Sequence, residues 1–306
     1  MGPVNARHAF RTARRAWALP VALLAAFSLP DWAQAQSANF DFGDGRHGSF
    51  TVPAGDTTIQ DLWSQVRTAA DLLAYDPANN AQVPHLENLT ISSGGTLSVG
   101  PYTGSANSAV DPKLGGVLRI KVRGTLTIES GAAIDATGRG YRGGTLEGGN
   151  QGQIGQQVDS WGNTGAISGE ANRGGGGGGF GEINGGANPG AGGGGGHREA
   201  GAPGTTGQGT STAGLGGLSF ETAAATAGQG FRDTYTFPRF GSGGGRGGQT
   251  ATFANVGALG GNGGGIIIIE AERIVNNGAI TANGNDGGSD LSGGGGGAGG
   301  SILIQT

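Results

Sequence analysis

The chain has 306 residues, of which 71 are glycine and none is cysteine, and its formal net charge at pH 7 is −4. A chain without cysteine has no disulfides, thiolate metal sites or cysteine nucleophiles. The net negative charge argues against nucleic-acid binding, which needs clustered basic side chains. Glycine has no Cβ to pack and loses much conformational freedom on folding, so the glycine-poor segments must supply most of the core.

Residues 1–35 have the pattern of a cleaved secretory signal. A basic start with four arginines is followed by an apolar stretch over 19–29 and a small-x-small cleavage sequence over 33–35. The apolar stretch is shorter than the roughly 20 residues of a membrane-spanning helix, which favours a cleaved signal over an uncleaved anchor. Arg14-Arg15 leaves twin-arginine export open as a route. We therefore expect an exported protein, extracellular or at the cell surface, with no transmembrane segment after cleavage.

One helix is predicted in the mature chain, between about Thr57 and Tyr75, with Asp56, Thr57 or Thr58 as its N-cap. Such a helix is more typical of core packing than of a partner surface, and we expect it to cover an open sheet edge. We accordingly divide the mature chain into a strand and capping helix over 36–85 and a glycine-rich strand region over 86–306. The apolar residues at helical spacing are Ile59, Leu62, Trp63, Val66, Leu72 and Leu73.

From Leu89 onward, short β-branched or Leu-rich segments alternate with Gly, Asn and Asp turns. The pattern Ala-Ile-x-Ala-x-Gly occurs over 133–138 and again over 279–284, which indicates a degenerate internal repeat. Isoleucines 266–269 do not alternate with polar residues, as expected for a strand buried on both faces. These features favour an all-β fold: a short right-handed parallel β-helix with long Gly-rich loops and one N-terminal helix. An antiparallel sandwich is the alternative.

The insert over about 139–264 consists of glycine runs separated by Gln, Asn, Ser and Thr. Its composition alone is typical of a disordered, low-complexity segment. The spaced aromatic residues instead favour ordered loops that are pinned against the strands. Glycine also permits a third arrangement, in which extended helices with three residues per turn pack side by side.

The glycine blocks and short strands follow one another in a definite order: 124–128, 138–144, 192–197, 241–245, 263–271 and 294–304. In this order the chain resembles a widespread group of exported bacterial Gly-rich proteins of uncertain function, found alone or fused to adhesive and repeat modules. The resemblance implies a β-helical surface module and carries no established catalytic residues.

Two kinds of candidate binding residue stand out. Hard oxygen ligands in a Gly-rich turn suit calcium, although a single imperfect copy of the calcium repeat favours a solvated turn; no other cofactor is expected. Aromatic rings flanked by guanidinium groups can bind sugars, and their alternative role is to anchor loops on the strands. The calcium candidates are Asn283, Asn285, Asp286 and Asp290, and the ligand-binding candidates are Arg139, Tyr141, Arg142, Trp161, Phe231, Arg232 and Tyr235.

No catalytic residues are assigned. At least two of the strand carboxylates Glu129, Asp135, Glu270 and Glu272 would have to converge with a positively charged residue such as Arg273 to support hydrolase or lyase chemistry. The histidines outside the signal lie in separate loops and form no triad pattern. We therefore expect a secreted non-enzymatic scaffold or adhesin of the cell surface or extracellular matrix, which binds polysaccharide or associates with itself. The alternatives are a β-helix polysaccharide-modifying enzyme and a module that works beside other domains.

Overall fold

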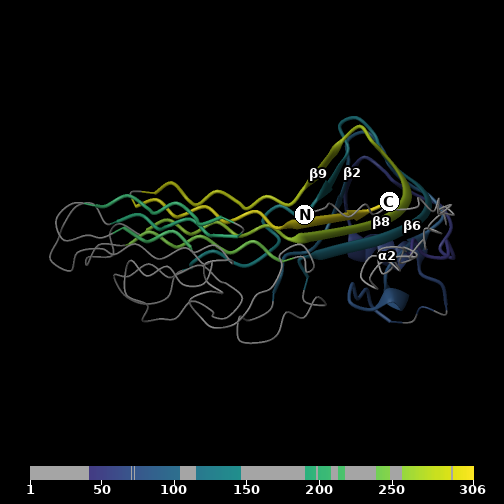
Figure 1. The fold of residues 1–306 in the computed structure, drawn as a ribbon, viewed down its shortest axis with the longest axis horizontal. Coiled ribbons are helices and arrows are strands. Elements are labelled where there is room, and N and C mark those ends of the chain that lie inside the picture. Colours follow the sequence, from purple (N-terminus) through teal and green to yellow (C-terminus); the bar gives the residue numbers. More distant parts are fainter. Residues whose placement is uncertain are drawn as a thin grey trace, which may run out of the picture. The chain divides into compact units, whose positions relative to one another are not determined.

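The structure is a computed structural model in which most described residues lie in strands or extended segments. All of them belong to one compact unit, 40–306. Within the described part, the regular elements are parallel strands, one α-helix and one short 3-10 helix over Asn80–Gln82 (Figure 1). The described residues are 41–69, 71, 73–103, 115–145, 190–197, 199–207, 213–217, 239–248, 257–290 and 292–306.

The strands form two parallel sheets. The first has the order β1-β4-β6-β8-β10, with β3 also paired to β6, and the second has the order β2-β5-β7-β9. Since every pairing among these strands is parallel, the antiparallel sandwich is not their arrangement. The strands are β1 Phe50–Val52, β2 Gly55–Thr58, β3 His85–Leu86, β4 Leu89–Ile91, β5 Gly95–Ser98, β6 Val117–Ile128, β7 Ala133–Asp135, β8 Ile266–Asn276, β9 Ala279–Thr281 and β10 Ser301–Gln305.

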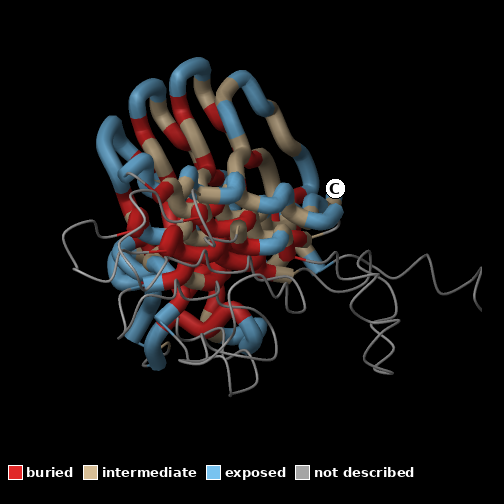
Figure 2. Tube along the Cα trace, turned by 90° about the vertical axis from the view of Figure 1, so that its left-hand side faces the viewer, coloured by how far each residue is buried: buried red, intermediate tan, exposed pale blue. Residues whose placement is uncertain are grey.

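Sequence repeats become neighbouring strands in this fold. Ala133 pairs with Ala279 and Ile134 pairs with Ile280, so the two Ala-Ile-x-Ala-x-Gly segments lie side by side in the second sheet. The long strands β6 and β8 also run together, with a shift in register between Val122 and Thr125. Figure 2 shows the successive turns of the chain next to one another, with exposed residues at their outer tips.

The core consists of apolar side chains at matching register in neighbouring strands. Val52, Ile91 and Ile128 share one register row and are fully buried. In β8, Ile267 and Ile269 enter this core while Ile266 packs against Tyr102 and its aromatic neighbours, which confirms a strand buried on both faces. The core is continuous across the predicted boundary at residues 85 and 86, because that boundary falls inside β3.

Helix α2 spans Ile59–Val66 and begins where the sequence predicted. Thr58 Oγ1 accepts a hydrogen bond from the Asp61 amide at 3.1 Å, and the Asp61 carboxylate is bonded to Thr58 in return, as in a capping box. Its apolar face joins the core, so core packing is confirmed. The predicted extension to Tyr75 is wrong: the backbone becomes extended at Arg67, and Leu73 is 63% exposed.

The described glycine segments are extended chains that hydrogen-bond to one another at intervals of three residues. The amides of Gly192 and Gly195 donate to the carbonyls of Gly293 and Gly296. The amides of Gly241, Gly244 and Gly247 donate to the carbonyls of residues 264, 261 and 258, which repeats the interval of three residues. This period is that of an extended helix with three residues per turn. The described parts of 139–264 are therefore not simple loops, and Figure 1 shows these segments running side by side.

We call this arrangement the glycine bundle; its described segments are 140–144, 190–195, 201–204, 214–217, 241–248, 257–265, 282–288 and 293–300. Its close packing depends on the missing Cβ atoms. A Cβ on Gly295 would collide with the backbone oxygen of Gly193, and one on Gly243 would collide with the backbone oxygen of Arg142. Glycine is thus required where the backbones approach most closely.

Candidate functional site

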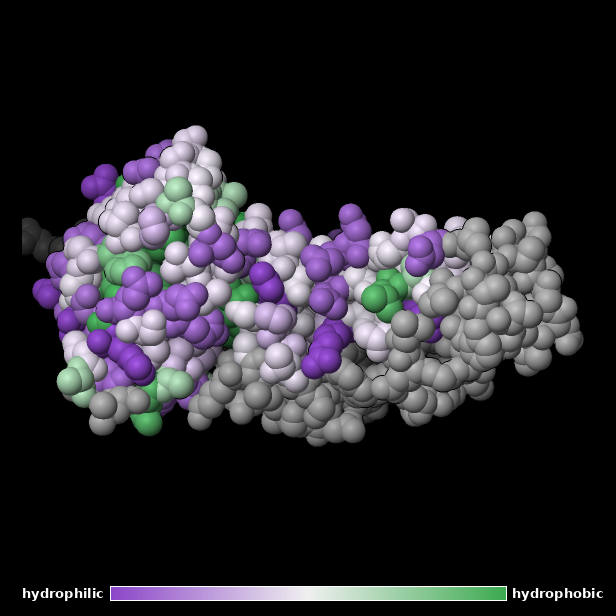
Figure 3. Space-filling model, turned by 180° about the vertical axis from the view of Figure 1, so that it is seen from behind, coloured by the Kyte–Doolittle hydropathy of each residue, from purple (hydrophilic) through white to green (hydrophobic). Residues whose placement is uncertain are grey.

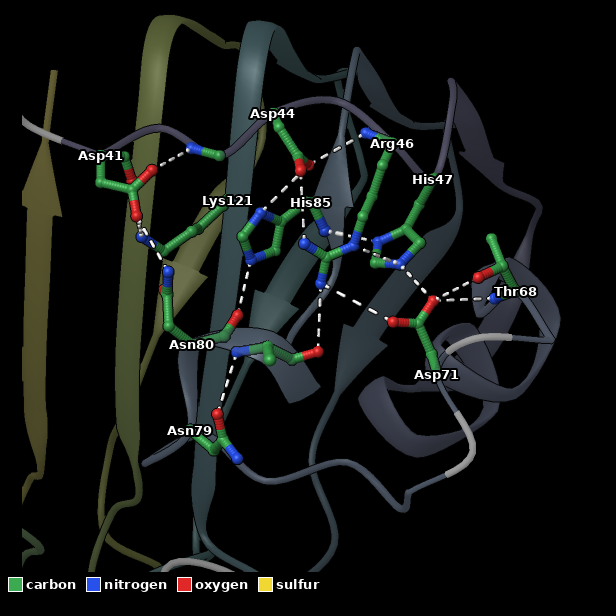
Figure 4. Close-up of polar contacts among 12 residues, drawn as sticks. Asp41, Asp44, Arg46, His47, Thr68, Asp71, Asn79, Asn80, His85 and Lys121 are labelled. Carbon is green, nitrogen blue, oxygen red and sulfur yellow. Dashed lines mark hydrogen bonds and ion pairs between the residues drawn. The ribbon is translucent and has the colours of Figure 1, made fainter.

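A group of charged and polar side chains lies where residues 41–48 pass over the first sheet (Figure 4). The residues come from this N-terminal segment, from the loop after α2 and the 3-10 helix that follows it, and from β3, β6 and β8. We call the group the N-terminal charge cluster, and its members are Asp41, Asp44, Arg46, His47, Asp71, Asn80, His85, Arg119, Lys121 and Glu270.

Strand pairing brings the central members of the cluster together. His85 is in register with Lys121, and Lys121 is in register with Glu270. The amide of His47 donates to the His85 carbonyl at 3.1 Å, which extends the row to the N-terminal segment. Since neighbouring strands lie about 4.7–4.9 Å apart, long side chains in such a row reach one another.

Lys121 is almost fully buried and is held between two carboxylates. Its Nζ lies 2.7 Å from Asp41 Oδ2 and 3.5 Å from Glu270 Oε1. Arg119 binds the same Glu270 in a bidentate manner, with Nε at 2.9 Å and Nη2 at 3.2 Å from the carboxylate oxygens. The bond from Lys121, followed by bonds from Gly43 and Asn80, holds the pKa of Asp41 well below its usual range. The charges of this part of the cluster therefore neutralise one another.

His47 ties the N-terminal segment to the loop after α2. Its Nδ1 accepts a hydrogen bond from the His85 amide at 2.8 Å, so the neutral ring carries its proton on Nε2, 3.1 Å from Asp71 Oδ2. Burial alone would raise the pKa of Asp71, but hydrogen bonds from Thr68 and then His47 lower it to about 2. Because the His47 side chain is fully buried, this pair has a structural role.

His85 is bound on one side only. Its Nε2 lies 2.6 Å from the Asn80 carbonyl oxygen and donates to it, while Nδ1 faces Asp44 Oδ1 at 3.3 Å without a hydrogen bond. Burial lowers the pKa of His85, although Asp44 and the Asn80 carbonyl act in the opposite direction. Burial would raise the pKa of Asp44, but the Arg46 amide, the Arg46 charge and His85 together lower it.

These shifts predict a loss of stability on acidification in two stages. A histidine with a lowered pKa in the folded state protonates first in the unfolded chain, so stability falls as the pH drops below about 6.5. Carboxylates with lowered pKa values, such as Asp41 and Asp71, contribute stability that is lost as the pH falls below about 3.8. Urea midpoints measured between pH 8 and pH 3 should show both declines. Burial also lowers the pKa of His197, so a His85→Gln variant should reduce the first decline without removing it. A wild-type midpoint that stays constant from pH 7 to pH 5, or a decline of the same size in His85→Gln, would contradict the assignment.

The ligand-binding candidates that the structure describes lie at the start of the glycine bundle. Tyr141 is 2% exposed and packs edge-on against Tyr102 and Phe240, with ring centroids 5.8 and 5.3 Å apart. Its ring therefore anchors the segment and presents no face to solvent. Arg139 and Arg142 are partly exposed, and Arg142 Nη2 donates to the Thr103 carbonyl at 3.3 Å. The remaining candidates, Trp161, Phe231, Arg232 and Tyr235, lie outside the described residues.

Of the calcium candidates, Asn283, Asn285 and Asp286 lie on an extended segment, and Asp290 lies at a bend that follows it. Asn285 donates its amide to Asn262 and accepts from Gly297, as a member of the glycine bundle. Among the described residues, no three His, Asp or Glu side chains converge as a metal site.

The candidate catalytic acids have separate partners in the described part of the chain. Glu129 accepts from the Ser93 amide at 2.9 Å. Asp135 accepts from the Thr281 hydroxyl at 2.5 Å. Glu270 lies in the N-terminal charge cluster, and both Glu272 and Arg273 are exposed. The convergence of Glu129, Asp135, Glu270 and Arg273 that an enzyme would need is therefore not found in this structure.

Sequence reasoning missed most of the N-terminal charge cluster. Its members are far apart in the chain, so the approach of Asp41 and His85 depends on which strands pair. One signal was present: Lys121 lies within the apolar run 117–122, and a buried lysine needs a carboxylate partner.

Comparison with protein-family models, curated proteins and solved structures finds no match to this chain. Among the described residues, none of the helices has the length and apolar character needed to cross a bilayer. Two features of the fold bear on function: the glycine bundle and the N-terminal charge cluster.

Proposed function

We propose that this protein is a secreted, non-enzymatic scaffold or adhesin of the cell surface or extracellular matrix. Its body would be a short right-handed parallel β-helix from which the glycine bundle extends. The parallel order of both sheets supports this architecture, since crossovers between parallel strands are almost always right-handed. The resemblance in the order of the glycine blocks supports the same role.

The observation that carries the proposal is the three-residue hydrogen-bond spacing within the glycine bundle. Most closely packed positions of the bundle are glycine, although Ser242, Arg246 and Ala258 are buried within it. Side chains of the outer segments emerge at repeats of about 9 Å along each one. Figure 3 shows hydrophilic side chains among the near-neutral glycines of this region. A firm surface with regularly spaced polar groups is suited to a repeating polymer such as polysaccharide.

An enzyme is the second candidate, and the N-terminal charge cluster is the observation that favours it. Asp41 and Asp44 have side chains that are 59% exposed, and they lie next to Lys121 and His85. However, the Lys121 and His85 side chains are only 1% and 5% exposed. Groups so enclosed are better placed to hold the N-terminal segment than to meet a polymeric substrate.

Retention on polysaccharide tests the proposal. Purified mature protein, beginning at Gln36, is expected to be retained saturably on polysaccharide extracted from the producing cells, with no release of sugar fragments. We expect Arg142→Ala to weaken retention about tenfold, as for the loss of one charged contact. Arg123→Ala is the matched control, because Arg123 has an exposed side chain paired with Glu87 in the strand region.

Two results would contradict the proposal. Absence of retention would exclude a polysaccharide adhesin, and release of reducing or unsaturated sugars would favour the enzyme. The assay is repeated with calcium and with a chelator, since loss of binding in chelator would identify a calcium-dependent contact.

A further inference from the structure

The hydrophobic core is uncovered at the end formed by β10. In register with Ile302 lie Ile267 and Leu118, which are fully buried, yet Ile302 itself is 44% exposed. The neighbouring row repeats the change: Ile120 and Ile269 are fully buried, whereas Ile304 is 45% exposed. Side chains at matching register face the same side of a sheet, so both isoleucines continue the core rows without a covering layer.

Two further register rows of the core also become more exposed in the last turn of the chain. Ile134 is fully buried in β7, but its partner Ile280 in the last strand of the second sheet is only partly buried. Leu126 and its partner Ile274 show the same change. We call Ile274, Ile280, Ile302 and Ile304 the open core end, and Figure 2 shows the last turn of the chain at the end marked C.

The opposite end of the stack is covered. Val52 lies in β1, the first strand of its sheet, and is fully buried. Ile59 and Leu62 of α2 are fully buried in the same cluster. A covered first turn cannot receive the open core end of another copy, so head-to-tail growth of the stack is blocked at this end.

We propose that the open core end binds the same end of a second copy of this chain about a two-fold axis. In the dimer, β10 would pair antiparallel with β10 of the second copy, centred on Leu303, and the four isoleucines of each copy would cover one another. Two-fold contacts place the same patch on both partners. This inference depends on the proposed scaffold function only for its biological purpose, since assembly would double the number of glycine bundles per particle.

Charge favours a second copy as the occupant. The overall charge is negative, but β9 and β10 contain no charged residue that would repel an identical surface. Sheet edges are normally protected by Lys, Pro or a covering element, and neither strand contains Lys or Pro.

Sedimentation equilibrium of the mature protein, without polysaccharide, tests the proposal. We expect a mass of two chains, and Ile302→Lys or Ile304→Lys should weaken the dimer by roughly a hundredfold, because each substitution removes two buried isoleucines. Leu215→Lys and Leu259→Lys are matched controls, since these leucines are 50% and 49% exposed in the glycine bundle. A monomeric wild type, or a dimer unchanged by the Ile variants, would overturn the proposal.

A cysteine variant provides a test that does not disturb the core. The chain has no cysteine, so Leu303→Cys introduces a single thiol at the centre of β10. Directly opposed residues of antiparallel strands have Cα atoms about 4.5–5.5 Å apart, within the reach of a disulfide. Mild oxidation should cross-link Leu303→Cys into a dimer and leave Leu215→Cys monomeric. Equal cross-linking of both variants, or of neither, would overturn the proposal, and the result does not depend on whether polysaccharide binds.

Discussion

A Gly295→Ala variant is expected to lose much of the order of the glycine bundle, whereas Gly296→Ala next to it should be nearly neutral. The Gly295 amide donates to Gly245 at 2.8 Å, and its carbonyl accepts from Gly261 at 2.8 Å. A Cβ at this position would collide with the backbone of Gly193. Overpacking usually costs about 1–3 kcal/mol, and here the obstacle is backbone that cannot rotate away, so the upper end of this range is expected.

Gly296 is a close control because a Cβ there would meet Asn285 O at 3.7 Å, an ordinary contact distance. Both variants change one hydrogen to a methyl group, and they have equal effects on the unfolded chain. The free energy of unfolding in urea and the rate of limited proteolysis within 139–264 should therefore separate them. If the two variants were equally stable, close backbone packing at Gly295 would not be what orders the bundle.

The strands could be predicted from the sequence because their signals are local. β-Branched and Leu-rich segments bounded by turns located β4, β6, β8 and β9. The repeated Ala-Ile pattern then identified two strands that pair directly, Ala133–Asp135 with Ala279–Thr281. These predictions succeed because each depends on the burial of apolar side chains close together in the sequence, whether they alternate with polar residues or, as in β8, form a continuous run.

The glycine bundle could be predicted only as a possibility. Gly192 bonds to Gly293, about a hundred positions later in the chain, and no side chain in either run specifies that choice. A run of glycines has the same pattern in every register, so its partner is set by the strands on either side. The charge cluster escaped prediction for a related reason, because Asp41 meets Lys121 only once β3 has paired with β6.

Apolar residues at helical spacing continue in the sequence beyond the residue at which helix α2 ends. Leu72 and Leu73 keep helical spacing, yet the chain leaves the helix at Arg67. Thr68 donates both its amide and its hydroxyl to Asp71 Oδ2, at 3.0 and 2.8 Å. This turn competes with a further helical turn and directs Asp71 towards His47, so the requirements of the charge cluster override the apolar spacing.

Glu270→Gln is expected to destabilise the protein by about 3 kcal/mol, because removing one partner leaves buried charge without compensation. Glu270 is the only carboxylate bound to Arg119 among the described residues, and it also lies 3.5 Å from the buried Lys121. Glutamine keeps the shape of the side chain and one oxygen acceptor, so the change measures mainly the lost charge. Urea unfolding at pH 7 gives the free-energy difference.

Glu272→Gln is the matched control, since it makes the same chemical change two positions along β8 at an exposed site. Substitutions at such sites usually stay within about 0.5 kcal/mol. If Glu270→Gln were as mild, the cluster would not be holding the N-terminal segment through neutralised charge. The exposed Asp41 and Asp44 would then be free to serve another role, and the enzyme candidate would gain support. If Glu270→Gln instead caused a large loss of stability while the refolded variant was retained normally on polysaccharide, the charge cluster would contribute to stability and the glycine bundle to binding.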